Sequence, residues 1–180
     1  MYQNWRISSF NGALLACYFI PAWTITSFKI MISPIHGLYE RANVSMALFF
    51  SDYMQIGTMS TVRFAWLLAL GKLTVVAFFA VFLLFTTRAS IRKTGGCDEA
   101  LAMALGIGSV ISFLSMIMAY KVGETAAMKL HVTELLLLLG TAILMAMEPP
   151  LLRVAPEAAK AAPNAPAMPA SIPSVIPVPE

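Results

Sequence analysis

The chain has 180 residues, of which 59% are apolar and only 12% are charged. A soluble domain of this length could not bury so much apolar surface, so the composition predicts a protein that faces lipid. The net charge of +3 is spread along the chain, without the dense basic block that nucleic-acid binding requires. We therefore expect the lipid bilayer, and not nucleic acid, as a partner.

Four apolar stretches are long enough to cross a bilayer. A hydrocarbon core of about 30 Å requires roughly 20 helical residues, and lipid offers no hydrogen-bond partner to an unpaired backbone amide, so each stretch should be an α-helix. The predicted spans cover about residues 7–28, 64–87, 101–120 and 130–147. The sequence thus predicts an all-α, polytopic membrane protein with its transmembrane domain in residues 1–148.

Between the first two spans, residues 38–56 predict an amphipathic helix that lies in the membrane interface. Wound as a helix, this segment places mostly polar residues on one arc, with Val44 and Leu48 as exceptions, and apolar residues on the other. A lid or partner-docking helix and a re-entrant segment are the alternatives. The polar arc holds Glu40, Arg41, Ser45, Ser51, Asp52 and Gln55, and the apolar arc holds Leu38, Tyr39, Ala42, Met46, Phe49, Phe50 and Tyr53.

Residues 149–180 form a tail with nine prolines and eight alanines. Proline removes amide donors and breaks helices, so the tail should be disordered and partly extended. A solvated spacer is the simplest interpretation, and a docking segment for a partner is the alternative.

The distribution of basic residues predicts the orientation of the chain. With four spans, both termini and the loop after Thr87 share one side, and this side holds six basic residues against five on the other. The cluster RASIRK at 88–93 is the densest, so the positive-inside rule places both termini in the cytoplasm. Short loops and the lack of an organelle signal favour a bacterial inner membrane.

Lys72 interrupts the apolar sequence of the second span, eight residues past its predicted start at Phe64. This position is roughly 12 Å deep at 1.5 Å per residue, where a charge is costly unless it has a partner or serves a pathway. Glu134 in the fourth span lies at a comparable depth, so we expect an intramembrane polar pair of Lys72 and Glu134. Snorkelling of Lys72 to interfacial water and a proton or ion relay are the alternatives.

His131 precedes Glu134 by three residues, which places both on one helix face. This spacing suits a metal ligand pair or a pathway, but the sequence supplies no further ligands near it, so no metal site or cofactor is predicted. An interfacial histidine at the helix entrance is the simpler interpretation.

The third span carries a row of small residues, Ala104, Gly108 and Ser112, and a second row with Ala102 and Gly106. Such rows allow close helix packing within a chain or between chains. No nucleotide fingerprint, nucleophile elbow or paired-carboxylate motif occurs, so we assign no catalytic residue, although a membrane enzyme built from scattered residues stays an alternative.

These features favour an accessory or structural subunit, or an assembly factor, of a larger membrane complex. Its expected partners are other membrane protein chains or further copies of itself. A small transporter or channel with a polar pathway around Lys72 and Glu134 is the alternative function.

Overall fold

A computed structural model describes residues 7–40, 43–88 and 96–148. These residues belong to one unit, which ends at Pro149. The described residues contain helices and no strand. The predicted disordered tail and several of the charges used for orientation, among them Arg6, Arg41 and Lys93, lie outside the described residues.

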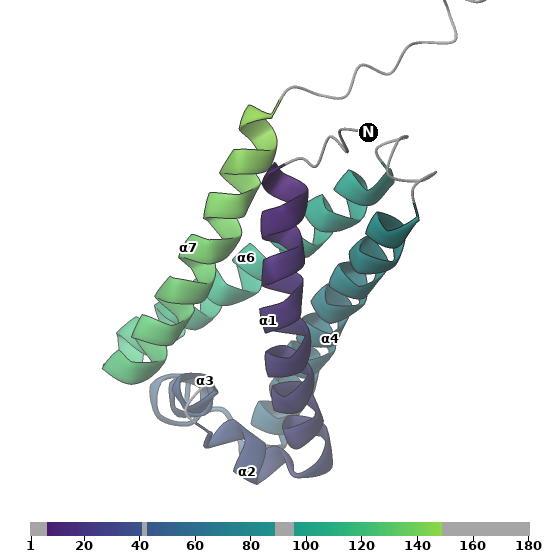
Figure 1. The fold of residues 1–180 in the computed structure, drawn as a ribbon. Coiled ribbons are helices and arrows are strands. Elements are labelled where there is room, and N and C mark those ends of the chain that lie inside the picture. Colours follow the sequence, from purple (N-terminus) through teal and green to yellow (C-terminus); the bar gives the residue numbers. More distant parts are fainter. Residues whose placement is uncertain (1–6, 41–42, 89–95, 149–180) are drawn as a thin grey trace, which may run out of the picture. The chain divides into compact units, whose positions relative to one another are not determined.

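Four long helices form the bundle: α1 (Ile7–Ile32), α4 (Thr58–Thr87), α6 (Gly96–Val122) and α7 (Thr125–Met147). They run alternately up and down, as Figure 1 shows. All four are long and apolar enough to cross a membrane, which confirms the all-α prediction for the described residues and is consistent with a multi-pass membrane protein. Each helix is longer than the span predicted for it, because its ends continue into polar sequence.

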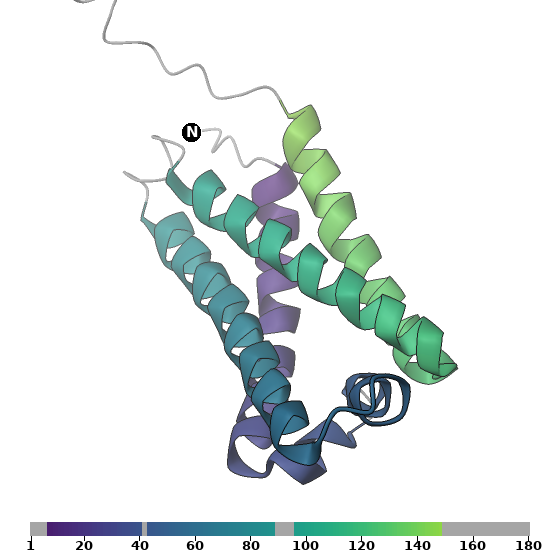
Figure 2. The same cartoon turned by 180° about the vertical axis from the view of Figure 1, so that it is seen from behind.

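The helices pack in the cyclic order α1, α4, α6, α7, and α7 closes the ring by packing on α1. Figure 2 shows α4 and α6 side by side on the face opposite to that of Figure 1. Apolar side chains from all four helices fill the interior. The largest fully buried apolar side chains are those of Phe19, Ile30, Phe79, Phe82, Leu101 and Leu138.

Exposed apolar side chains cover the outside of the bundle. Each of the four long helices contributes several of them, so the exposure is not a single patch. A surface of this kind is unfavourable in water and suits a lipid environment. Examples along the helices are Leu14, Phe28, Leu67, Leu84, Phe113 and Ile143.

Residues 33–57, which we call the connecting segment, join α1 to α4 at one end of the bundle (Figure 1). Its described part folds into three short helices, α2 (Pro34–Leu38), α3 (Val44–Leu48) and the π-helical turn η1 (Phe49–Tyr53). Within the predicted helix over 38–56, the described residues are helical over 44–53, in α3 and η1, so the helix is shorter than predicted. Its place in a membrane interface stays a prediction. Asn43 stands at the amino-terminal cap of α3 and begins a new helix there.

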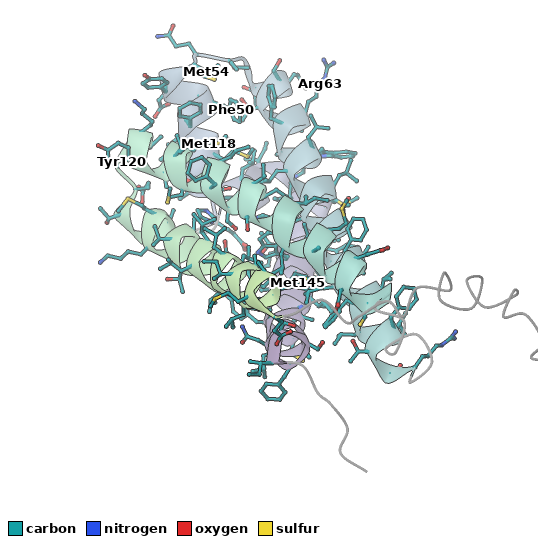
Figure 3. The ribbon with its side chains drawn as sticks, turned by 90° about the horizontal axis from the view of Figure 1, so that it is seen from above. Phe50, Met54, Arg63, Met118, Tyr120 and Met145 are labelled. Atoms are coloured by element: carbon teal, nitrogen blue, oxygen red, sulfur yellow. The ribbon has the colours of Figure 1, made fainter. Side chains whose placement is uncertain are left out.

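The connecting segment is anchored to the bundle by an aromatic contact and by polar contacts. Phe50 of η1 stacks on Phe64 of α4, with ring centroids 4.6 Å apart. Both α3 and η1 pack on α6, and in Figure 3 Phe50 projects near Met118 of α6. Ser45 is buried here, although the helical arcs placed it on the polar side. The segment thus covers one end of the four-helix bundle.

Candidate functional site

Gly108 of α6 marks a close contact among three helices. A Cβ atom at this position would lie 3.3 Å from Leu138 Cδ1 of α7 and 3.6 Å from Val75 Cγ1 of α4. The missing side chain lets the three helices approach closely. Phe19 of α1 and Phe79 of α4 stack beside this contact, with ring centroids 5.8 Å apart. Together these residues form an apolar layer across the bundle.

One helical turn from this apolar layer, toward the connecting segment, α4, α6 and α7 each carry a buried polar residue. Lys72 lies three residues before Val75, Ser112 four residues after Gly108, and Glu134 four residues before Leu138. Residues three or four apart share a helix face, so these three side chains enter one layer between the helices. Their exposed fractions are 3%, 1% and 6%.

Trp23 and His131 join these three residues, and we call the five of them the polar layer: Trp23, Lys72, Ser112, His131 and Glu134. Asn43 borders the layer on the side of the connecting segment. All six residues are buried. They come from all four long helices and from α3's amino-terminal cap, so the fold as a whole positions the layer.

Asn43 holds the Lys72 ammonium. Lys72 Nζ donates a hydrogen bond of 3.0 Å to Asn43 Oδ1, and Asn43 Nδ2 donates one of 3.0 Å to the Gly37 carbonyl oxygen. The ammonium also lies 5.7 Å from the centroid of the Trp23 ring, within the range of a cation–π interaction. The lysine stem reaches toward the end of the bundle, as a snorkelling side chain does, but its head meets a buried amide.

Glu134 has a partner for each carboxylate oxygen. Trp23 Nε1 donates a hydrogen bond of 3.1 Å to Oε1, and His131 Nδ1 lies 3.0 Å from Oε2. The i, i+3 spacing of His131 and Glu134 brings both onto one face of α7, as the sequence indicated. The indole of Trp23, in contrast, comes from a helix that is distant in sequence.

Lys72 and Glu134 share the polar layer without a direct salt bridge between them within the described part of the chain. Trp23 links the two, since its ring faces the ammonium and its N–H donates to the carboxylate. The expected polar pair is thus mediated by an aromatic residue. The length of the lysine side chain explains the difference, because it carries the ammonium toward Asn43.

Three buried polar atoms have no hydrogen-bond partner within residues 7–40, 43–88 and 96–148: Ser27 Oγ, Ser112 Oγ and His131 Nε2. Buried polar groups in proteins are nearly always paired, so each such atom calls for an explanation. Ser112 and His131 belong to the polar layer, and Ser27 lies one turn from Trp23 along α1. The unmet hydrogen-bonding capacity is therefore concentrated at this layer.

Two further polar contacts join α1 to α7. Asn11 Nδ2 donates a hydrogen bond of 2.7 Å to Thr141 Oγ1, and the Glu148 carboxylate accepts hydrogen bonds from both the backbone N–H and the hydroxyl of Ser8. Glu148 thereby caps the amino terminus of α1, where a negative charge is favourable. Glu134, Thr141 and Glu148 are spaced by seven residues, and this spacing is the signal in the sequence that marks the face of α7 toward α1.

The row of Ala104, Gly108 and Ser112 is buried inside the bundle, where α6 meets α4 and α7. The second row faces outward. There, exposed Ala102 and Gly106 line an apolar groove of about 440 Å³ between α6 and α7. The groove is completed by Leu105, Ser109, Leu139, Ala142, Met145 and Ala146.

The described residues contain no group of three or more His, Cys, Asp or Glu side chains that could hold a metal ion. The polar layer supplies one imidazole, one carboxylate and one ammonium, a set that can exchange protons and bind small polar groups. No known family model matches the sequence, and no curated protein or solved structure is similar to it. The geometry of the polar layer and of the outer surface therefore carries the functional interpretation.

Proposed function

We propose that this chain is a multi-pass integral membrane protein that serves as an accessory or structural subunit, or an assembly factor, of a larger membrane complex. A bacterial inner membrane, with both termini in the cytoplasm, is the setting that the distribution of basic residues and the short loops favour. Its partners are the lipid bilayer and other membrane chains.

The observation that carries the proposal is the contrast between the interior and the outer surface. Both buried charges are engaged inside the chain, Lys72 by Asn43 and Glu134 by Trp23 and His131. The outward face of α6 and α7 instead offers an apolar groove with small residues. In lipid, helix association depends on close packing at small residues, so this groove suits a further transmembrane helix.

Two glycines provide a matched test. Gly106 lies in the groove, whereas Gly140 is an exposed glycine of α7 that is not among the groove residues, and an added Cβ would meet no atom within 4 Å at either position. Gly106→Leu fills the groove, and Gly140→Leu adds the same side chain outside it. We expect the wild type, extracted in mild detergent, to migrate with defined other chains in a fixed ratio.

Gly106→Leu should abolish this association while Gly140→Leu retains it, with both variants folded and equally abundant. A wild-type protein that migrates as a lone monomer, or as an oligomer of itself alone, contradicts the accessory role. Equal loss of association in both variants contradicts the groove as the contact.

A small transporter or channel is the second candidate. The unpartnered Ser112 Oγ and His131 Nε2 beside Lys72 and Glu134 favour it, since polar groups within a membrane commonly mark a pathway. Purified protein in vesicles with an internal pH-sensitive dye tests conduction of protons directly. Flux that is lost in Lys72→Met at equal protein content supports this role, and flux equal to that of empty vesicles contradicts it for protons.

A further inference from the structure

His131 is placed to accept a proton inside the bundle. Its side chain is 2% exposed, its Nδ1 lies 3.0 Å from Glu134 Oε2, and its Nε2 has no partner among the described residues. A neutral imidazole carries one N–H. With an ionised Glu134 as acceptor, that hydrogen is on Nδ1, and Nε2 is left as a bare basic lone pair.

We propose that His131 and Glu134 form a reversible proton-binding site inside the bundle. His131 Nε2 takes up one proton and the imidazole becomes an imidazolium. Its Nδ1–H hydrogen bond to Glu134 then becomes an ion pair, and the new Nε2–H can donate a hydrogen bond to a hydroxyl or to water. The site is independent of the accessory role proposed above.

The charges around the imidazole set the balance of this uptake. Glu134 on α7 stabilises the imidazolium, whereas Lys72 from α4 opposes it. The residues that α1 and α6 contribute to the polar layer, Trp23 and Ser112, are neutral, and so is Asn43 of the connecting segment. Tyr18 of α1 is the other titratable group that interacts electrostatically with Glu134. Before the proton is taken up, the positive charge of Lys72 and the negative charge of Glu134 cancel. After uptake the layer carries one net positive charge, so the imidazolium competes with Lys72 for Glu134.

Histidine NMR of the intact chain tests the proposal, because the sequence has two histidines and the second, His36, is exposed. The protein is labelled with ¹⁵N-histidine and placed in lipid nanodiscs, and the spectra are recorded from about pH 5 to about pH 8, the range in which histidine ordinarily titrates. The His36→Gln variant assigns the two signals.

We expect neutral His131 to carry its hydrogen on Nδ1 at the high end of the range, and to convert reversibly to the imidazolium as the pH falls. Glu134→Gln removes the stabilising anion, so the proton affinity of His131 should fall by about tenfold or more, while the signal assigned to His36 should not change. The proposal is overturned if neutral His131 carries its hydrogen on Nε2, or if His131 stays neutral down to about pH 5.

Discussion

Asn43 and Lys72 are 29 residues apart in sequence and meet in a buried hydrogen bond of 3.0 Å between the Asn43 amide oxygen and the Lys72 ammonium. The other end of the same amide is bonded to the Gly37 carbonyl oxygen. One side chain therefore connects α2, the start of α3 and the interior of α4. The position of the connecting segment on the bundle depends on this link.

Asn43→Ala should destabilise the protein. The substitution removes the hydrogen-bond acceptor of a buried ammonium, and we expect the free energy of unfolding in detergent to fall by about 1–3 kcal/mol. Hydrogen exchange in residues 33–57 should become faster, because the segment loses its polar link to α4 and keeps only apolar contacts such as the Phe50–Phe64 stack. The double variant Asn43→Ala with Lys72→Met should recover part of the loss, since no buried charge is then left unpaired. A single variant as stable as the wild type would contradict this role of Asn43.

Trp23→Phe separates the two functions of the indole. The ring that faces Lys72 is largely kept, whereas the N–H donor to Glu134 is lost, so one oxygen of a buried carboxylate is left without its partner. We expect a loss of about 1–3 kcal/mol in the free energy of unfolding. Trp66→Phe is the matched control, since Trp66 is 46% exposed on the outside of α4, and its change should stay within about 0.5 kcal/mol. Equal effects of the two substitutions would show that the indole N–H is dispensable.

Gly108→Val should disrupt the contact among α4, α6 and α7. The Cβ alone would lie 3.3 Å from Leu138, and the two methyl groups have no space without moving a helix. Overpacking of this kind costs about 1–3 kcal/mol. Gly106→Val, two residues away on the same helix, meets no atom within 4 Å at its Cβ and serves as the control for helix propensity. A lower unfolding temperature for Gly106→Val than for Gly108→Val would refute the assignment of the buried face of α6.

Ser8 and Glu148 should be coupled energetically. A double-mutant cycle with Ser8→Ala and Glu148→Gln isolates the contact from the other effects of each change. We expect a coupling of about 0.5–1.5 kcal/mol in the free energy of unfolding, the size of a typical hydrogen bond. Additive effects of the two substitutions would indicate that the carboxylate does not stabilise the start of α1.

The sequence was sufficient to predict the four long helices, because each needs only an apolar stretch of membrane-spanning length. It also singled out Lys72, Glu134 and His131 as unusual, since polar residues stand out in such stretches. The partners were harder to foresee. Trp23 lies in an apolar stretch, and its N–H could be paired with Glu134 only once the register of α1 against α7 was known.

The connecting segment was the least predictable part of the fold. A helical wheel over residues 38–56 assumes one helix axis, whereas the observed segment changes axis at Asn43 and again near Gln55, which has a positive φ of 51°. Asn43 therefore points into the bundle instead of following either predicted arc. The seven-residue spacing of Glu134, Thr141 and Glu148, in contrast, is visible in the sequence and does identify the face of α7 that meets α1.

The partners of the two buried charges share one property with consequences for biosynthesis. Asn43 and Trp23 both precede Lys72 in the chain, and Trp23 and His131 both precede Glu134. A ribosome that delivers the chain from its amino terminus thus releases each charged residue after the groups that will bind it. In the proposed membrane setting, neither charge would have to wait in the bilayer for a later helix, so the order of synthesis itself would protect both residues during insertion.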